Sequence, residues 1–173
     1  MTQCYTQIVE GCRRGDRKSQ RALYDAFAPM AMGVCMRFAG SRAEAEDMLQ
    51  DSFVRVFERI GGLKDPERLG GWVHRVVVNV CLRQASRQSR QPDPAADYDE
   101  PWAPPADPFA LQEVVDALQH ISPRQRAVFN LVEVEGCSLD EAAAAMHSTN
   151  ANMRVSLSRA KSNLRRILTE KKT

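Results

Sequence analysis

Hydrophobic residues recur at intervals of three and four positions along most of the chain, which is the spacing of one face of an α-helix. The clearest run consists of Ala45, Met48, Leu49, Phe53, Val56, Phe57 and Ile60. Ser41 and Glu44 form a capping-box pair before this run, and Gly61-Gly62 favours a helix end after it. The pattern therefore predicts a helix from Ser41 to Ile60.

Two further runs have the same period. The upstream run consists of Leu23, Phe27, Met30, Val34 and Phe38, and the downstream run of Trp72, Val73, Val76, Val77 and Val80. The segment 76–78, with three valines, is also compatible with a strand, but the helical period continues on both sides of it. Since no segment alternates convincingly between polar and apolar residues, we predict an all-α protein without a sheet.

The last third of the chain contains three helix starts in quick succession. Ser122 can cap the first helix, with Pro123 at the first helical position and Gln125 at the third. Ser138 and Glu141 form a capping box at the start of the second helix, and Thr149 caps the last. Gly136 ends the first helix, and the segment 146–148 is the turn between the second and third. A short helix, a tight turn and a basic helix predict a helix-turn-helix, which places one helix in the DNA major groove.

Residues 91–109 differ from the rest of the chain. They include six prolines and five acidic residues but no Lys or Arg. Proline removes backbone donors and disfavours helix in the residue before it. The segment is therefore predicted to be an extended linker. It divides the chain into two small helical domains, residues 1–90 and residues 110–173.

The net charge of +2 is small, but the charged residues are unevenly distributed along the chain. Residues 1–90 carry 15 Lys and Arg against 10 Asp and Glu, and from Arg154 onward there are seven basic residues and one acidic residue. This distribution indicates two modules that face a polyanion, joined by an acidic tether. A hydrophobic fraction of 43% allows packed cores.

The cysteines and the lack of a long apolar run bear on the compartment. The five cysteines are scattered and form no C-x-x-C, and Cys35 and Cys81 lie among apolar neighbours. We expect them to be reduced, core-filling thiols. Without a signal peptide or a long apolar run, the chain is expected to be cytoplasmic, with no membrane insertion.

The predicted last helix carries the candidate DNA-reading residues. Its apolar stripe consists of Met153, Leu157, Leu164 and Leu168, and its other faces carry Asn150, Asn152, Arg154, Ser158, Arg159 and Lys161. Asparagine can pair with adenine and arginine with guanine, whereas lysine mostly contacts phosphate. The alternative is an ordinary amphipathic helix with a solvated basic face.

Two surfaces of the N-terminal block are candidates for binding. On the helix 41–60 the side opposite the apolar stripe carries Asp47, Gln50, Asp51, Val54 and Glu58. This side is either a docking site for a basic partner helix or a solvated face. On the helix after Gly70-Gly71 the residues Trp72, Arg75, Asn79 and Arg83 are three or four positions apart. This set suits single-stranded or melted DNA, although Trp72 alone is also a typical core residue.

Four motifs in order resemble one family. The segment 45–53, AEDMLQDSF, resembles the AEDLxQExF signature of bacterial RNA polymerase sigma factors, and the segment 71–79, GWVHRVVVN, is similar to the WLxRIxxN that follows it. The segment 121–129, ISPRQRAVF, resembles LPxxQRxVF, and the segment 157–164, LSRAKSNL, resembles LSRARxxL. The two-module layout resembles the extracytoplasmic-function (ECF) subgroup.

The resemblance implies a promoter-specificity subunit that binds core RNA polymerase, recognises the −35 and −10 elements and helps to melt the promoter. Residues 1–90 would be sigma domain 2 and residues 110–173 sigma domain 4. The residues implied for the clamp helices of the largest polymerase subunit are Asp47, Gln50, Asp51 and Val54. Those implied for the −10 element are Lys64, Arg68, Trp72, Arg75, Asn79 and Arg83, with a flipped-out base held in a pocket of the loop Gly61–Arg68. Those implied for the −35 duplex are Thr149, Asn150, Asn152, Arg154, Ser158, Arg159 and Lys161. An anti-sigma factor is an implied partner, and no cofactor is implied.

The C-terminal block departs from the family pattern at three places. Val155 and Ser156 replace a Ser-Arg pair, which removes a usual basic contact and leaves the −35 sequence open. The Ala142–Ala145 run lacks an expected core isoleucine. His147 occupies the position of a turn glycine, so we expect it to adopt a left-handed conformation.

Two other classes of function compete with this interpretation. A stand-alone helix-turn-helix regulator, with an N-terminal block that senses a ligand or dimerises, remains an alternative. An enzyme is disfavoured, because the sequence has no G-x-x-x-x-G-K-[ST] and no H-E-x-x-H. His74, His120 and His147 show no metal-site spacing with each other or with cysteine, so no metal site and no catalytic residue are predicted.

Overall fold

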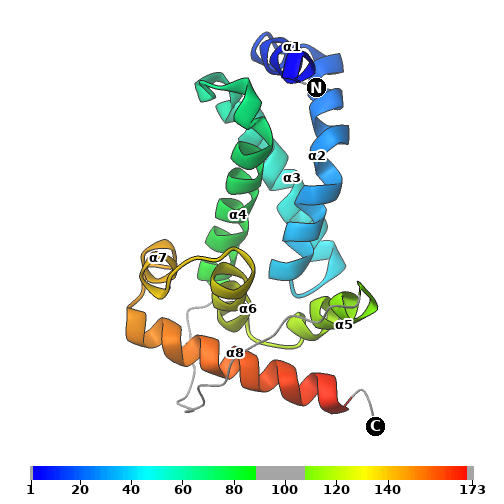
Figure 1. Ribbon diagram of the computed structural model, residues 1–173. Coiled ribbons are helices and arrows are strands. Elements are labelled where there is room, and N and C mark those ends of the chain that lie inside the picture. Colours follow the sequence, from blue (N-terminus) through cyan, green and yellow to red (C-terminus); the bar gives the residue numbers. More distant parts are fainter. Residues whose placement is uncertain (1, 89–107, 171–173) are drawn as a thin grey trace. The chain divides into compact units, whose positions relative to one another are not determined.

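The computed structural model describes residues 2–88 and 108–170, and every regular element in these two ranges is a helix. The predicted all-α class is therefore confirmed (Figure 1). The predicted linker, residues 91–109, lies outside the described residues except for its last two, which begin a helix at Pro108. Across those two ranges, no helix is long and apolar enough to cross a membrane.

The chain forms two compact units, Met1–Cys35 with Arg42–Cys81 and Met36–Ser41 with Leu82–Thr173. The first range of described residues, 2–88, contains four α-helices: α1 (Thr2–Arg13), α2 (Arg17–Phe38), α3 (Arg42–Arg59) and α4 (Leu69–Gln88). Two short 3₁₀ turns, Ile60–Gly62 and Pro66–Arg68, form the loop between α3 and α4. The boundaries drawn at residues 90 and 110 from the linker composition stay predictions.

The helices expected in the N-terminal block are present. The helix α3 begins directly after Ser41 and ends before Gly61-Gly62. The valine run 76–78 lies inside α4, so the helical interpretation of that run is confirmed. Cys35 and Cys81 are fully buried thiols with their sulfur atoms 3.8 Å apart, in agreement with their prediction as core residues.

The hydrophobic pattern does not identify α1, which packs on the start of α2. The rings of Tyr5 and Phe27 lie 5.9 Å apart, and Val9 is fully buried. A Cβ atom on Gly11 would lie 1.9 Å from the hydroxyl of Ser19, so the two helices approach at a position that requires glycine. Asp16 accepts from the Ser19 hydroxyl at 2.6 Å and the Ser19 amide at 2.9 Å, and these bonds lower the pKa of the Asp16 carboxyl.

The C-terminal helices begin where their capping residues predict. The elements are α5 (Pro108–Leu118), α6 (Pro123–Phe129), a π-helical turn (Asn130–Val134), α7 (Leu139–Ala145) and α8 (Asn150–Glu170). Ser122 accepts from the Gln125 amide, Ser138 and Glu141 form a complete capping box, and Thr149 accepts from the Asn152 amide at 3.2 Å. The three predicted helix starts are therefore confirmed.

The core of the C-terminal helices lies between α5, α6 and α8. It contains Leu118, Phe129 and Leu164, with Leu157 and Leu168 packed against it. Three residues of the predicted apolar stripe of α8, Leu157, Leu164 and Leu168, therefore face this core, and the fourth, Met153, is fully buried. Arg126, a buried arginine of α6, donates through Nη1 to the carbonyls of Leu118, Gln119 and Ile121 at 3.2–3.3 Å. These bonds supply hydrogen-bond donors to carbonyl groups at the C-terminal end of α5.

His147, in the turn between α7 and α8, has φ of 50°, so the predicted left-handed conformation is confirmed. Because a Cβ atom makes this conformation unfavourable, His147→Gly is expected to stabilise the α7–α8 region by about 1 kcal/mol. Hydrogen exchange of the α7 and α8 amides in the full chain measures this directly. The matched control is Ala144→Gly inside α7, which should instead destabilise by about 1 kcal/mol. Slower exchange in neither variant, or in both, would contradict the assignment of strain to His147.

Candidate nucleic-acid interface

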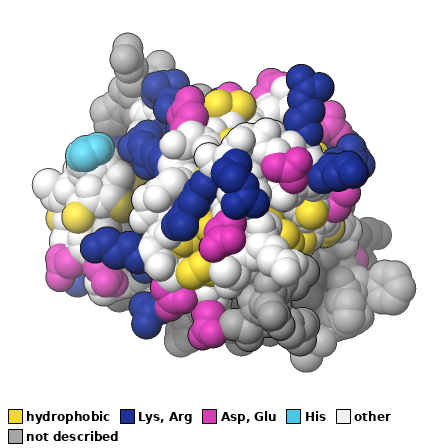
Figure 2. Space-filling view, turned by 90° about the horizontal axis from the view of Figure 1, so that it is seen from above, with side chains coloured by type: hydrophobic (Ala, Val, Ile, Leu, Met, Phe, Trp, Pro, Cys, Tyr) yellow, Lys and Arg dark blue, Asp and Glu magenta, His cyan; other side chains and the backbone are white. Residues whose placement is uncertain are grey.

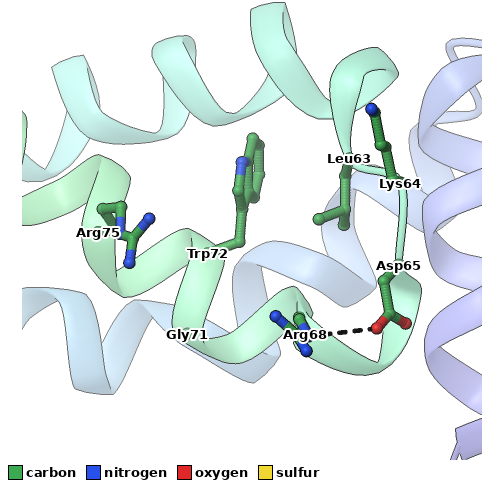
Figure 3. A pocket seen from close by; sticks show the side chains of 7 residues that line it. All are labelled: Leu63, Lys64, Asp65, Arg68, Gly71, Trp72 and Arg75. Carbon is green, nitrogen blue, oxygen red and sulfur yellow. Dashed lines mark ion pairs between the residues drawn. The ribbon is translucent and has the colours of Figure 1, made fainter.

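A pocket of about 540 Å³ opens where the α3–α4 loop meets the first turns of α4. It is lined by Leu63, Lys64, Asp65, Arg68, Gly71, Trp72 and Arg75 (Figure 3). Four of the six residues predicted for the −10 element therefore line one cavity. A volume in this range is typical of sites for small organic ligands, and it is large enough to admit a nucleobase.

The pocket combines an aromatic surface with an excess of positive charge. Trp72 is half-buried, so it is neither a pure core residue nor a fully exposed one. Part of its indole packs against the protein and part lines the cavity. In the view of Figure 3 the indole stands between Arg75 on α4 and the loop residues Leu63 and Lys64. Arg68 pairs with Asp65 at 3.4 Å, which leaves the charges of Lys64 and Arg75 in surplus among the lining residues. An aromatic ring with adjacent cations can stack a base and hold its phosphate.

The exposed side of α4 continues this surface beyond the pocket. Its buried side includes Val73, Val77 and Cys81, whereas Arg75, Asn79 and Arg83 are exposed. Asn79 and Arg83 do not line the pocket but extend along the helix from it at intervals of four residues. Figure 2 views the end that carries α1 and the loop, and basic and acidic side chains are mixed on this face.

The second predicted surface lies on α3. Asp47, Gln50, Asp51 and Val54 are all exposed, and Val54 has 54% of its surface accessible. The opposite side of α3 is buried through Met48, Phe53, Val56 and their neighbours. An exposed valine one helical turn from the carboxylate of Asp51 suits a docking site for a basic, partly apolar partner.

The residues predicted for the −35 duplex do not share one environment. Thr149, Asn152 and Arg154 are exposed, whereas Asn150, Ser158 and Lys161 are half-buried. The Asn150 amide donates to Asp140 at 2.7 Å, and Lys161 pairs with Glu133 at 2.9 Å. Thr149 also caps the helix, so its hydroxyl is used by the backbone. Asn152 and Arg154 are therefore the residues of this set that α8 presents most directly to a ligand.

Arg159 is placed differently from its prediction. Only 6% of its surface is exposed, and its three guanidinium nitrogens have no hydrogen-bond partner. In this structure the side chain therefore lies inside the C-terminal unit rather than on the exposed side of α8. Its contact with a base edge stays a prediction, and it requires the side chain to swing outward.

Sequence reasoning missed residues that hold α8 in place. Arg124 donates to the hydroxyls of Ser148 at 2.7 Å and Ser156 at 3.1 Å, which fixes the turn and the first half of α8. Asn163 donates to Gln125 at 2.9 Å. Because the partners of each bond lie on different elements of the structure, a single sequence gives no signal of the pairing, although Ser156 is one of the residues that depart from the family pattern.

Two family models match the chain, and together they cover more than two thirds of it. Residues 23–91 match Sigma-70 region 2 and residues 111–164 match Sigma-70, region 4. The pocket, the exposed side of α4 and the acidic face of α3 all lie in the first range, and the helix-turn-helix lies in the second.

Relatives and a solved structure agree with these matches. The ECF RNA polymerase sigma factor SigG of Mycobacterium tuberculosis is 29% identical over 90% of this chain, which spans about half (49%) of SigG. The RNA polymerase sigma factor CarQ of Myxococcus xanthus is 29% identical over 94% of this chain and 96% of CarQ. The sigma factor RpoE from Bartonella quintana, solved with the anti-sigma factor NepR, is similar in fold with a TM-score of 0.52 and 19% identity, over 86% of this chain and 96% of RpoE. The chain therefore belongs to the sigma-70 family, in its extracytoplasmic-function group.

Proposed function

We propose that this chain is a promoter-specificity subunit that binds core RNA polymerase, recognises the −35 and −10 elements and helps to melt the promoter. The observation that carries the proposal is the pocket in which Trp72 lies beside Lys64 and Arg75. Part of this half-buried indole lines the cavity beside two cations, and such a surface suits an unstacked base and its phosphate.

Each surface has a separate physical task in this proposal. Asn152 and Arg154 of α8 contact the −35 duplex in the major groove, where amide and guanidinium groups read base edges. The pocket then stacks one base of the −10 strand on Trp72, which compensates for the energy of unstacking that base. Asp51 and Val54 on α3 bind the clamp helices of the polymerase and so hold the −10 surface next to the DNA.

The test is transcription by the reconstituted holoenzyme. Core RNA polymerase is mixed with the purified chain and a pool of randomised promoters, and the transcribed sequences are recovered. Enrichment of a two-part motif with a fixed spacer would support the proposal. Tight, specific binding to duplex DNA without polymerase, together with no initiation in its presence, would support a stand-alone regulator instead.

The partners and the compartment follow from the same proposal. RpoE of Bartonella quintana was solved with an anti-sigma factor, and we infer that an anti-sigma factor also controls this chain. The proposed site of action is the cytoplasm, where promoter DNA and polymerase are found. Affinity purification from cells should recover a chain-specific inhibitor in addition to polymerase, and recovery of polymerase alone under all growth conditions would contradict the inhibitor.

Arg154→Ala is expected to weaken binding of the holoenzyme to a promoter with an intact −35 element by about 1–3 kcal/mol, because Arg154 is the exposed guanidinium near the start of α8. The measurement is the dissociation constant at a stated salt concentration, for promoters with and without the −35 element. The control is Arg166→Ala, which removes an exposed arginine from the same helix where it pairs with Glu170 at 3.1 Å. A larger loss for Arg159→Ala at unchanged stability would show that Arg159 swings out to make the contact instead.

A further inference from the structure

The helix α1 touches the loop that forms one wall of the pocket. It contacts both 3₁₀ turns of the α3–α4 loop, and in Figure 1 it lies at the same end of the N-terminal unit as that loop. In its last turn Arg13 donates from Nη2 to the backbone carbonyl of Leu63, a residue that lines the pocket. Residues 2–13 precede the range matched by Sigma-70 region 2, which begins at residue 23.

Besides this bond, the buried side chains of Ile60 and Leu63 anchor the loop, and hydrogen bonds join residues within it. Asp65 accepts from the Glu67 amide at 3.0 Å, and Leu63 donates to the Ile60 carbonyl at 3.2 Å, but these bonds lie within the loop itself. The Arg68–Asp65 pair is also internal, and its side chains are 85% and 50% exposed, so it adds little. No atom lies within 4 Å of where a Cβ atom on Gly61 or Gly62 would be, so this part of the loop is open. The bond from Arg13 ties the loop to a separate helix.

The helix α1 is itself well fixed, which makes it a suitable anchor. Val9 is fully buried and Cys12 is 6% exposed. The close approach of Gly11 to Ser19 sets the distance between α1 and α2. Arg13 follows directly after this anchored turn, so its guanidinium is presented to the loop from a rigid base. A carbonyl held by a charged donor has a defined position relative to the side chain that lines the pocket.

We propose that Arg13 is a positioning residue for the pocket: it holds the loop at Leu63 so that the wall opposite Trp72 keeps the spacing that one base requires. The inference rests on the proposed function, because the base is the ligand of that site. It assigns a part in reading the −10 element to the helix α1, whose residues do not line the pocket. A group that acts through another residue should affect discrimination at one base more than overall affinity.

The experiment uses holoenzyme reconstituted from core RNA polymerase and the full chain. The probes are forked promoter DNAs whose −10 single strand carries either the normal base or an abasic site at one position in turn. With the wild-type chain, the position that occupies the pocket should show at least about a fivefold loss of affinity when the base is absent. With Arg13→Ala, affinity for the intact probe should fall by no more than about the same fivefold, and most of the abasic penalty at that position should disappear.

Two variants separate positioning from folding. Arg13→Lys keeps a donor within reach of the carbonyl and should restore most of the penalty, whereas Arg14→Ala removes a neighbouring exposed charge and should behave as wild type. Hydrogen exchange of amides 62–68 in the free chain should rise in Arg13→Ala alone. An unchanged abasic penalty and unchanged exchange in Arg13→Ala would overturn the inference. A wild-type chain with no abasic penalty at any position would overturn the proposed pocket function as well, and raised loop exchange would then show only a structural role for Arg13.

Discussion

Asp51→Arg is expected to abolish stable binding of this chain to core RNA polymerase. Asp51 is exposed on α3 beside Val54, and the substitution replaces a negative charge with a positive one in the middle of the proposed docking face. Juxtaposed like charges cost several kcal/mol at an interface, so the dissociation constant should rise by more than about 100-fold. Co-elution with core polymerase in size-exclusion chromatography, followed by a fluorescence titration, measures the loss.

The structure supplies a matched control for this substitution. Asp25→Arg makes the same change of charge on α2, where Asp25 is exposed and paired with Arg21 at 2.9 Å, outside any proposed surface. Both variants should keep the helical content of the wild-type chain, because neither carboxylate is buried. Retained co-elution of Asp51→Arg, or equal loss in both variants, would assign this side of α3 to solvent rather than to polymerase.

The elements that the sequence predicted best are those with local causes. Helix starts depend on a side chain that accepts a bond two or three residues later, and Ser122, Ser138 and Thr149 all do so. The conformation of His147 was expected from the family resemblance, since His147 stands where the family pattern has a turn glycine, and its φ of 50° agrees. The exposure of Asn79 and Arg75 followed from helical periodicity alone.

The features that sequence reasoning missed have non-local causes. Lys161 and Arg159 lie two positions apart on α8, yet one pairs with Glu133 and the other is buried. Which of the two reaches a ligand depends on how α8 packs against the preceding helices, and a pattern of basic residues contains no information on that packing. The bond from Arg13 to the Leu63 carbonyl joins residues fifty positions apart, and its acceptor is backbone, which carries no side-chain signal.

The same distinction explains why the pocket could be predicted in part. The loop residues Lys64 and Arg68 and the helix residues Trp72 and Arg75 are close in sequence, so a turn followed by a helix brings them together without long-range contacts. The pairing of Arg68 with Asp65 was not anticipated, and it reduces the cationic surplus of the cavity. Lys64 and Arg75 consequently dominate the attraction of the pocket for a phosphate.

Arg75→Glu should therefore have the second large effect, on the melted strand rather than on polymerase binding. It removes an exposed cation beside Trp72 and puts a carboxylate where the phosphate of the stacked nucleotide is expected. Losing a charge-assisted hydrogen bond to the phosphate costs about 1.5–3 kcal/mol, and the added repulsion should bring the fall in open-complex formation to more than about 100-fold. Permanganate footprinting of the −10 region measures this fall in open-complex formation, and co-elution with core polymerase should be unchanged.

Arg17→Glu is the control, since it makes the same change of charge at an exposed position of α2 outside the pocket. A premelted promoter should restore less than half of the lost activity if Arg75 holds the strand; full rescue would instead limit Arg75 to the melting step.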